Sequence, residues 1–318
     1  MYNFLNRNRM LQGLFLSLLL GVAVFLLLSN SVTFNFAWSP FPALFFSTAL
    51  TSSLFLKILT VIVLSIILIL CQLFFRKHDF FDTPSYYPAV FFLSILLSSG
   101  IAANSLFSLF FLFILTLILL VNVDYTLPVV KGRIFISGIL IGILSFFNLA
   151  APLLLFFLIG SLMTHRFARL KDVCVIFFGF LLPFIYFFSY YFFINQLENV
   201  AGVFSQLSFF GFTKVLFTLS YFQIIKLILL IIILFYFLIW LHSQYTSKLI
   251  VMRRRLNSVS VMTFILLCML FFSNSSYEEL QLYLILPFTV HFSLAIREQR
   301  RWIFHDILII STLVLLWL

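Results

Sequence analysis

The chain has 318 residues, of which 64% are hydrophobic and only 9% are charged. Soluble domains average about 45–50% apolar and about 25% charged residues, so this composition excludes an ordinary soluble globular domain. The apolar runs are continuous rather than alternating, which predicts transmembrane α-helices and disfavours a β-barrel. We therefore expect one integral membrane domain over residues 1–318, built as an all-α transmembrane bundle.

The formal net charge is +10, with 19 Lys and Arg against 9 Asp and Glu. The basic residues stand in short clusters between apolar runs, which is the pattern of cytoplasmic loops in membrane proteins. We therefore predict membrane lipid, and not nucleic acid, as a partner. The cysteines Cys71, Cys174 and Cys268 all lie within apolar runs, so we expect small core residues rather than a disulfide framework.

The first predicted helix covers residues 11–28 and follows Arg7 and Arg9, which places the N-terminus in the cytoplasm. The run ends without an Ala-x-Ala site, which favours a spanning helix over a cleavable signal peptide. Residues 29–53 are expected to form an exoplasmic loop along the membrane surface, and residues 54–75 the second helix.

Two uncharged stretches then predict two short helical hairpins. The stretch between Asp82 and Asp124 is expected to fold into arms at residues 89–103 and 105–121, with a turn near Asn104. The position of Asn104 near the midpoint is compatible with duplication of a hairpin unit. Asn is common in turns for local reasons, however, so this position is only weak evidence for duplication.

The second predicted hairpin lies between Arg133 and Arg166, where no charged residue occurs. A single helix of this length would span roughly 48 Å, whereas the hydrocarbon core of a bilayer is about 30 Å thick. Asn148 and Pro152 near the middle favour a turn. Each arm would then be roughly 24 Å long, so the hairpin must thin the bilayer or be shielded by other helices.

The remaining predicted helices cover residues 173–193, 221–241, 258–272, 280–296 and 303–318. Pro183 and Pro287 are expected to kink two of them. Residues 195–219 are expected to lie in the outer interface, and residues 242–257 to form a cytoplasmic loop. The layout has about eleven helices, with a cytoplasmic N-terminus and an exoplasmic C-terminus.

This layout places most basic residues on the cytoplasmic side. Five arginines are the predicted contacts to anionic lipid or to an acidic partner surface: Arg133, Arg166, Arg253, Arg254 and Arg255. The preference for Lys and Arg on the cytoplasmic side would by itself explain the positions of these five arginines.

Side chains for metal or cofactor chemistry do not show the required spacing. We predict every histidine to be a polar residue near the cytoplasmic interface: His78, His165, His242, His291 and His305. Transition-metal sites need several convergent ligands, so we predict no metal and no cofactor. Gly138-x-x-x-Gly142 is a candidate close-packing face, although small residues at this spacing also arise by chance.

The helix count and the hairpins resemble the polytopic glycosyltransferases of the C type, whose catalytic acid sits in the first exoplasmic loop. Residues 29–53 contain no Asp, Glu or His, so Glu278 or Glu279 would have to serve as the general base. The same acids also fit a capping box that opens the helix at residues 280–296. We favour the capping interpretation and lean against an enzyme.

Three further stretches carry a second resemblance: RIFISGILIG at residues 133–142, GFLLP at residues 179–183 and ELQLYLILP at residues 279–287. Together with the short basic N-terminus, they resemble an uncharacterised family of polytopic inner-membrane proteins of Bacteroidota. The resemblance implies an inner-membrane location and assigns no catalytic residue.

Two functions are therefore expected. The first is a non-catalytic integral inner-membrane protein, a partner or scaffold subunit of a larger complex of integral membrane proteins. The alternative is a lipid-linked glycan transferase, polymerase or flippase. Short hairpins favour the first function, because they become stable when buried against other proteins.

Overall fold

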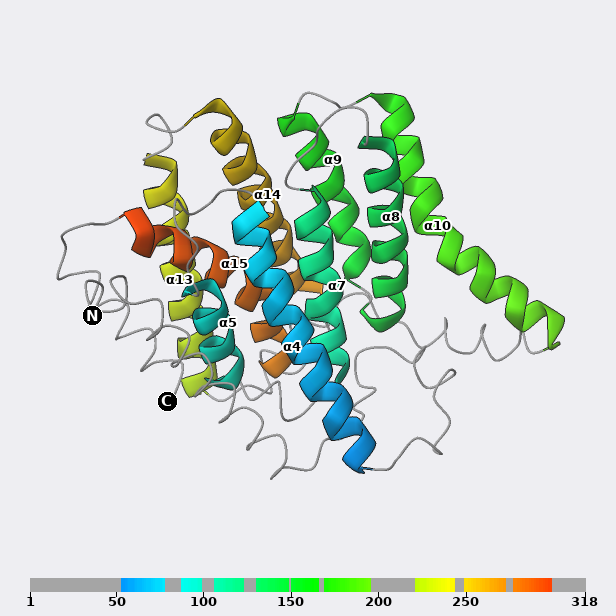
Figure 1. Cartoon of the computed structure of the whole chain (residues 1–318), viewed down its shortest axis with the longest axis horizontal. Helices are drawn as coiled ribbons and strands as arrows, with labels where there is room; N and C mark the ends of the chain where they lie inside the picture. The colour runs from blue at the N-terminus through cyan, green and yellow to red at the C-terminus, as the bar shows by residue number, and fades with distance from the viewer. Residues whose placement is uncertain are drawn as a thin grey trace.

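The computed structural model describes residues 53–77, 87–98, 106–122, 130–148, 150–165, 169–195, 221–243, 249–272 and 277–298. Within these ranges every regular element is a helix, so the all-α prediction is confirmed (Figure 1). Several predictions fall outside the described residues: the helices at residues 11–28 and 303–318, most of both exoplasmic loops, Asn104 and Arg166.

Two helices in the described part of the chain are long and apolar enough to cross a membrane. One spans Ile58–Lys77 within α4 (Ser53–Lys77), and the other is α10 (Leu170–Phe193). Shorter apolar helices cover Leu109–Asn122, Ala151–Thr164, Leu227–Ile239 and Tyr283–Leu294. The predicted helices at residues 54–75 and 173–193 correspond to the two long ones.

The second predicted hairpin is present as two antiparallel helices joined by a turn, and its arms, like those of the first, pack mainly on other helices. Its arms are α8 (Val130–Phe147) and α9 (Leu154–Thr164), joined by the short 3₁₀ helix η2 (Ala151–Leu153). Ser137, in the third turn of α8, and Ser161, in the last turn of α9, both hydrogen-bond to Asn122 at the end of α7. The chain therefore returns to the end from which it came. The arms are unequal, however, with 18 residues in α8 and 11 in α9.

The first predicted hairpin does not form a packed pair of arms. Its arms are α5 (Tyr87–Ser98) and α7 (Leu106–Asn122). α5 packs against α4 and α15 (Tyr277–Glu298), whereas α7 packs mainly against α4 and α8. The two arms therefore find their principal neighbours elsewhere in the bundle.

The last described helices are α13 (Tyr221–Ser243), α14 (Ile250–Phe272) and α15. The predicted cytoplasmic loop at residues 242–257 is wrong in its second half, because α14 begins at Ile250 and includes the three arginines. Arginine is a good helix former, and the Arg253 amide donates to the Leu249 carbonyl at 2.9 Å. Hydropathy marks only the lipid-buried part of such a helix, so it misses the charged first turns.

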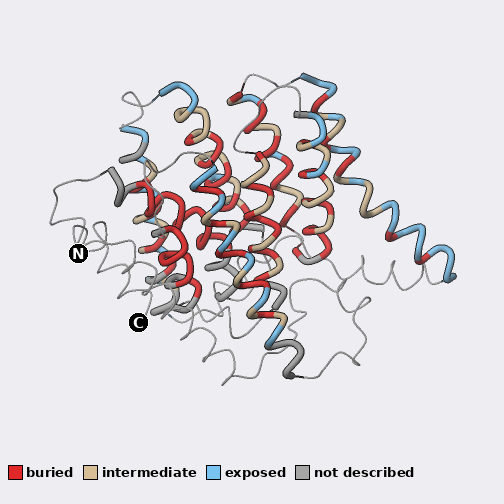
Figure 2. The backbone as a smooth tube through the Cα atoms, in the orientation of Figure 1, coloured by how far each residue is buried: buried red, intermediate tan, exposed pale blue. Residues whose placement is uncertain are grey.

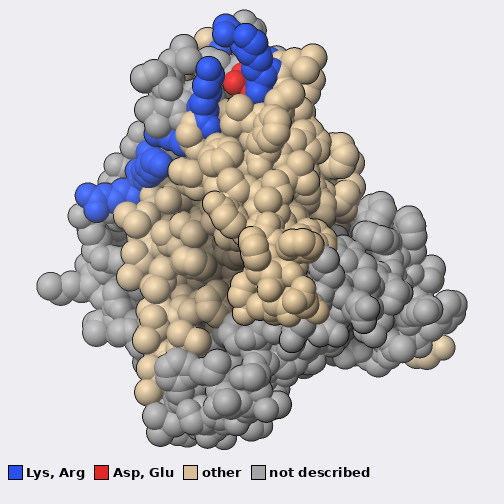
Figure 3. Space-filling view, turned by 90° about the vertical axis from the view of Figure 1, so that its right-hand side faces the viewer, with Lys and Arg blue, Asp and Glu red and all other residues tan. Residues whose placement is uncertain are grey.

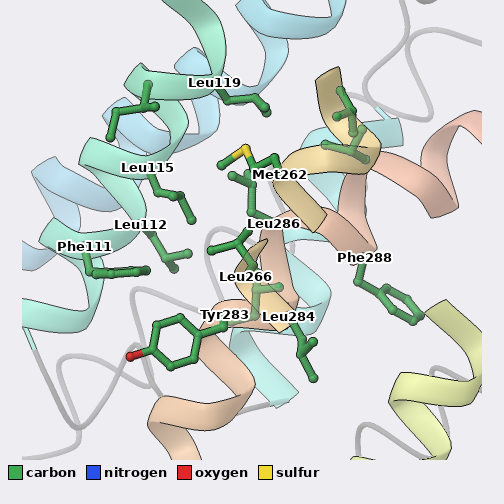
Figure 4. Packing of buried hydrophobic residues seen from close by; sticks show 14 of the residues in the cluster. Phe111, Leu112, Leu115, Leu119, Met262, Leu266, Tyr283, Leu284, Leu286 and Phe288 are labelled. Atoms are coloured by element: carbon green, nitrogen blue, oxygen red, sulfur yellow. The ribbon is translucent and has the colours of Figure 1, made fainter. Parts of the chain in front are cut away.

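The core of the bundle is apolar and continuous between α7, α14 and α15 (Figure 4). The rings of Phe111 and Tyr283 meet edge to face with centroids 5.5 Å apart, and those of Phe91 and Phe292 with centroids 4.6 Å apart. Edge-to-face pairs of this kind add to the stability that burial provides. These contacts hold α15 against α5 and α7.

Apolar side chains also cover outer faces of the bundle (Figure 2). On α4 they form one stripe of exposed residues: Ile58, Ile62, Ile66, Ile69 and Leu73. Their spacing of three or four residues places them on one helical face. Large exposed apolar surfaces mark contacts with lipid or protein.

Cys174 is also exposed, so the prediction that it is a core residue is wrong, whereas Cys71 is buried.

Lys and Arg side chains gather at one end of the bundle, which we call the basic end (Figure 3). It comprises the C-terminal end of α4 and the N-terminal ends of α8, α10 and α14. Its described members are Arg76, Lys77, Lys131, Arg133, Arg169, Lys171, Arg253, Arg254 and Arg255. Lys77 Nζ donates to the Leu120 carbonyl at 3.3 Å, which fixes the end of α4 beside the end of α7.

Candidate functional site: polar contacts between the helices

A cluster of polar side chains interrupts the apolar core near the basic end. We call it the polar cluster: Asn122, Ser137, Ser161, Thr164, His165 and Ser258. These residues come from the ends of α7 and α9 and from the third turns of α8 and α14, and His165 directly follows α9. All except the partly buried Thr164 are buried.

Asn122 joins three helices. Its Nδ2 donates to the Ile118 carbonyl and to Ser137 Oγ, both at 2.7 Å, and Ser137 Oγ donates in turn to the Arg133 carbonyl at 2.8 Å. Its own main-chain carbonyl accepts from Ser161 Oγ at 2.9 Å. Carbonyls in the last turn of a helix have no partner within that helix, so Ser161 caps α7 from α9.

The second half of the cluster connects α9 to α14. Ser258 Oγ lies 3.1 Å from Ser161 Oγ and 3.2 Å from Thr164 Oγ1. The Thr164 hydroxyl donates to the Ser161 carbonyl at 2.7 Å, and His165 Nδ1 lies 2.9 Å from the same oxygen. A carbonyl can only accept, so His165 Nδ1 holds the proton in this contact.

This geometry does not activate a nucleophile. Thr164 Oγ1 lies 3.1 Å from His165 Nδ1, as a hydroxyl and its base would. An activated hydroxyl must give its proton to an unprotonated ring nitrogen. Here Nδ1 is a donor and the Thr164 proton points to a carbonyl, so the cluster acts as a set of interhelical hydrogen bonds.

A second polar contact lies at the opposite end of the α8–α9 hairpin. Asn148 Nδ2 donates to the Tyr283 hydroxyl of α15, and Asn148 Oδ1 accepts from the Ala150 amide at 2.8 Å. The second bond is an Asx turn, which reverses the chain. Asn148 and Pro152 both lie in the connection between α8 and α9, where the turn was predicted.

His291 is buried in the centre of the bundle, with 1% of its surface exposed. Its Nε2 lies 2.8 Å from Thr263 Oγ1 of α14, and that hydroxyl donates to the Val259 carbonyl at 2.9 Å. The prediction that His291 is an interfacial residue is therefore wrong, whereas His165, although buried, lies near the basic end. The sequence did contain a signal for this buried contact. Thr263 and His291 are polar residues that lie inside two successive apolar runs.

Two parallel helices approach closely through glycine. An added Cβ would lie 2.5 Å from the Ile176 carbonyl at Gly138, from the Phe180 carbonyl at Gly142, and from the Phe135 carbonyl at Gly179. Residues further along α8 face residues further along α10, so the two helices run in the same direction. The predicted close-packing role of the Gly138–Gly142 pair is confirmed.

The two candidate acids and the two predicted kink prolines lie apart from the polar cluster. Glu278 and Glu279 lie in the first turn of α15, which is the end opposite Arg253, Arg254 and Arg255 because Tyr283 contacts the far turn at Asn148. Pro183 and Pro287 lie inside α10 and α15, which continue through them.

Among the residues that the structure describes, no three His, Cys, Asp or Glu side chains converge as metal ligands would. Comparisons with protein families, with curated proteins and with solved structures returned no match. The resemblance to inner-membrane proteins of Bacteroidota therefore stays a prediction.

Proposed function

We propose that this chain is a multi-pass protein of the bacterial inner membrane and a non-catalytic subunit of a larger membrane complex. In this proposal it has about eleven helices, a cytoplasmic N-terminus and an exoplasmic C-terminus. The basic end faces the cytoplasm, since cytoplasmic segments collect Lys and Arg. The two membrane-capable helices and their exposed apolar faces support this placement.

The observation that carries the subunit role is the outer surface of α10. One face of this helix packs on α8, while its C-terminal half diverges from the bundle (Figures 1 and 2). That half exposes four aromatic side chains, which we call the aromatic surface: Tyr186, Tyr190, Phe192 and Phe193. Aromatic side chains are enriched in protein–protein interfaces, so this surface fits another integral membrane protein.

The polar cluster supports a non-catalytic role. Its hydroxyl groups and its amide make hydrogen bonds that join α7, α8, α9 and α14. In a membrane such groups are costly to leave unpaired, and pairing them fixes how helices pack. The cluster therefore serves the rigidity of the bundle that presents α10.

The test is native mass measurement after gentle detergent extraction. We expect the wild-type chain in a species well above its own 37.1 kDa. A variant with Tyr186→Leu, Tyr190→Leu and Phe193→Leu should lose that species, because the rings that fill the interface are gone. The control, Ile58→Leu, Ile62→Leu and Ile66→Leu on α4, should keep it. A wild-type monomer under every mild condition would contradict the proposal.

The alternative function, handling of a lipid-linked glycan, depends on Glu278 and Glu279 at the end opposite the basic end. Two outcomes together would favour it over a subunit role. A deletion strain would have an altered surface glycan, and wild type would restore that glycan while Glu278→Gln/Glu279→Gln would not.

A further inference from the structure

The first two thirds of α10 present one continuous outward face. It consists of exposed residues at spacings of three or four: Lys171, Cys174, Phe178, Leu181 and Ile185. This spacing places the side chains on the same side of the helix. Phe178 is 70% exposed and Ile185 is 60% exposed. The opposite side carries Ile176 and Gly179, which are buried against α8.

The end of this face at the start of α10 is positively charged. Arg169 and Lys171 are exposed at the start of α10, and Lys131 is exposed at the start of the parallel helix α8. Figure 3 shows basic side chains gathered here, with one acidic group among them, above a surface of uncharged residues. Asp172 is the acidic residue in the first turn of α10, and the three exposed basic residues outnumber it, so this end keeps a net positive charge.

A positive group above a long apolar face matches the chemistry of an anionic phospholipid. From Lys171 to Ile185 the helix rises roughly 21 Å at 1.5 Å per residue, which exceeds the roughly 15 Å of hydrocarbon in one leaflet. A phosphate beside Arg169 and Lys171 would therefore place its acyl chains along Phe178 and Leu181 without leaving the helix.

We propose that this face of α10 binds an anionic phospholipid of the leaflet at the basic end, with its phosphate held by Arg169 and Lys171. Lys131 adds to the positive potential. The inference rests on the proposed membrane placement, and it concerns the end of α10 opposite the aromatic surface.

Another part of the basic end provides a matched control. Arg76 lies at the C-terminal end of α4, and Arg254 lies in the second turn of α14. Replacing both removes the same charge from the same end of the molecule without touching α10. Lys77 is unsuitable for this purpose, because it hydrogen-bonds to the end of α7.

The experiment titrates the full-length protein in mild detergent with phosphatidylglycerol or phosphatidylcholine and counts bound lipids by native mass spectrometry. We expect the wild type to prefer phosphatidylglycerol. Arg169→Gln/Lys171→Gln should weaken phosphatidylglycerol binding about thirtyfold, since each basic residue near an anionic surface contributes about fivefold. Arg169→Lys/Lys171→Arg and Arg76→Gln/Arg254→Gln should both keep the preference.

Equal retention of the two lipids by the wild type would overturn the inference, because it indicates annular lipid only. An equal loss in the Arg76→Gln/Arg254→Gln variant would also overturn it, since total charge would then explain the effect. Binding of inorganic phosphate without any lipid preference would do the same. Membrane fractionation and melting temperature show that each variant is folded.

The two proposals fail separately in these measurements. Arg169→Gln/Lys171→Gln leaves the aromatic surface intact, so the larger native species should persist. If the wild type shows no larger native species but keeps its preference for phosphatidylglycerol, only the proposed subunit role is refuted. Absence of the chain from the membrane fraction would remove both.

Discussion

At the scale of single residues, Asn148 has two roles that its position in the chain predicts only in part. A turn between two apolar arms favours an amide there, and its Oδ1 does form an Asx turn with Ala150. Its contact with Tyr283, far away in the sequence, has no local signal. The side chain therefore fixes both the reversal of the hairpin and the position of α15.

The Asn148–Tyr283 contact is expected to show a favourable coupling energy. In a double-mutant cycle of Asn148→Ala and Tyr283→Phe, we expect about 0.6 kcal/mol and at most about 1.7 kcal/mol, the range for interhelical hydrogen bonds in membrane proteins. Unfolding in mixed micelles measures it. A control cycle of Tyr283→Phe with Ser137→Ala, roughly 16 Å from Asn148 along α8 at 1.5 Å per residue, should be additive. Zero coupling in the first cycle would contradict the structure.

At the scale of elements, the contact between α8 and α10 depends on three glycines whose missing side chains let backbone meet backbone. Rigid carbonyls, rather than flexible side chains, lie against Gly138, Gly142 and Gly179. Neighbouring atoms cannot move away from an added methyl group unless the helices separate. Each of the three positions therefore requires glycine for packing.

The five glycines with defined surroundings predict a graded series of stabilities. Alanine at Gly138, Gly142 or Gly179 should each lower the free energy of unfolding by about 1–3 kcal/mol, the cost of overpacking. Gly160→Ala should cost less, because the added methyl group would meet a side chain, that of Val261, rather than backbone. Gly132→Ala, in open space on the same helix α8, should be neutral or stabilising by up to about 1 kcal/mol. Unfolding in micelles ranks them, and a destabilised Gly132→Ala would refute the order.

Much of the element layout could be predicted because long apolar runs reveal helices whatever surrounds them. The start of α14 could not, since its arginines lie beyond the apolar run yet continue the helix. The sequence also did not reveal which face of each helix is buried. Apolar residues occur on both sides of these helices, so the predictions misplaced exposed Cys174 and buried His291. The polar cluster escaped prediction because its members are far apart in the sequence.

At the scale of the whole molecule, four described helix ends that carry basic residues meet at one end of the bundle. α4 reaches it at Lys77, and α8, α10 and α14 begin there. The α10 helix finishes at the opposite end, where Asn195 adopts φ 54°, a left-handed conformation that stops helices. The positions of these ends make the topology testable.

Single cysteines in a background without Cys71, Cys174 and Cys268 should report the two sides. A membrane-impermeant maleimide added from the periplasmic side should react with Asn195→Cys and not with Lys131→Cys or Arg254→Cys, because basic segments resist translocation. All three should react once the membrane is dissolved in detergent. Labelling of either basic-end cysteine in intact membranes would place that end outside and invalidate the proposed orientation.

The glycine contact also constrains how the chain is made. α8 leaves the ribosome well before α10, and α9 must be synthesised between them. Until α10 emerges, the glycine face of α8 therefore has no neighbour that fits it. A chain terminated after α9 would expose that face permanently, and we expect the cell's membrane proteases to remove it.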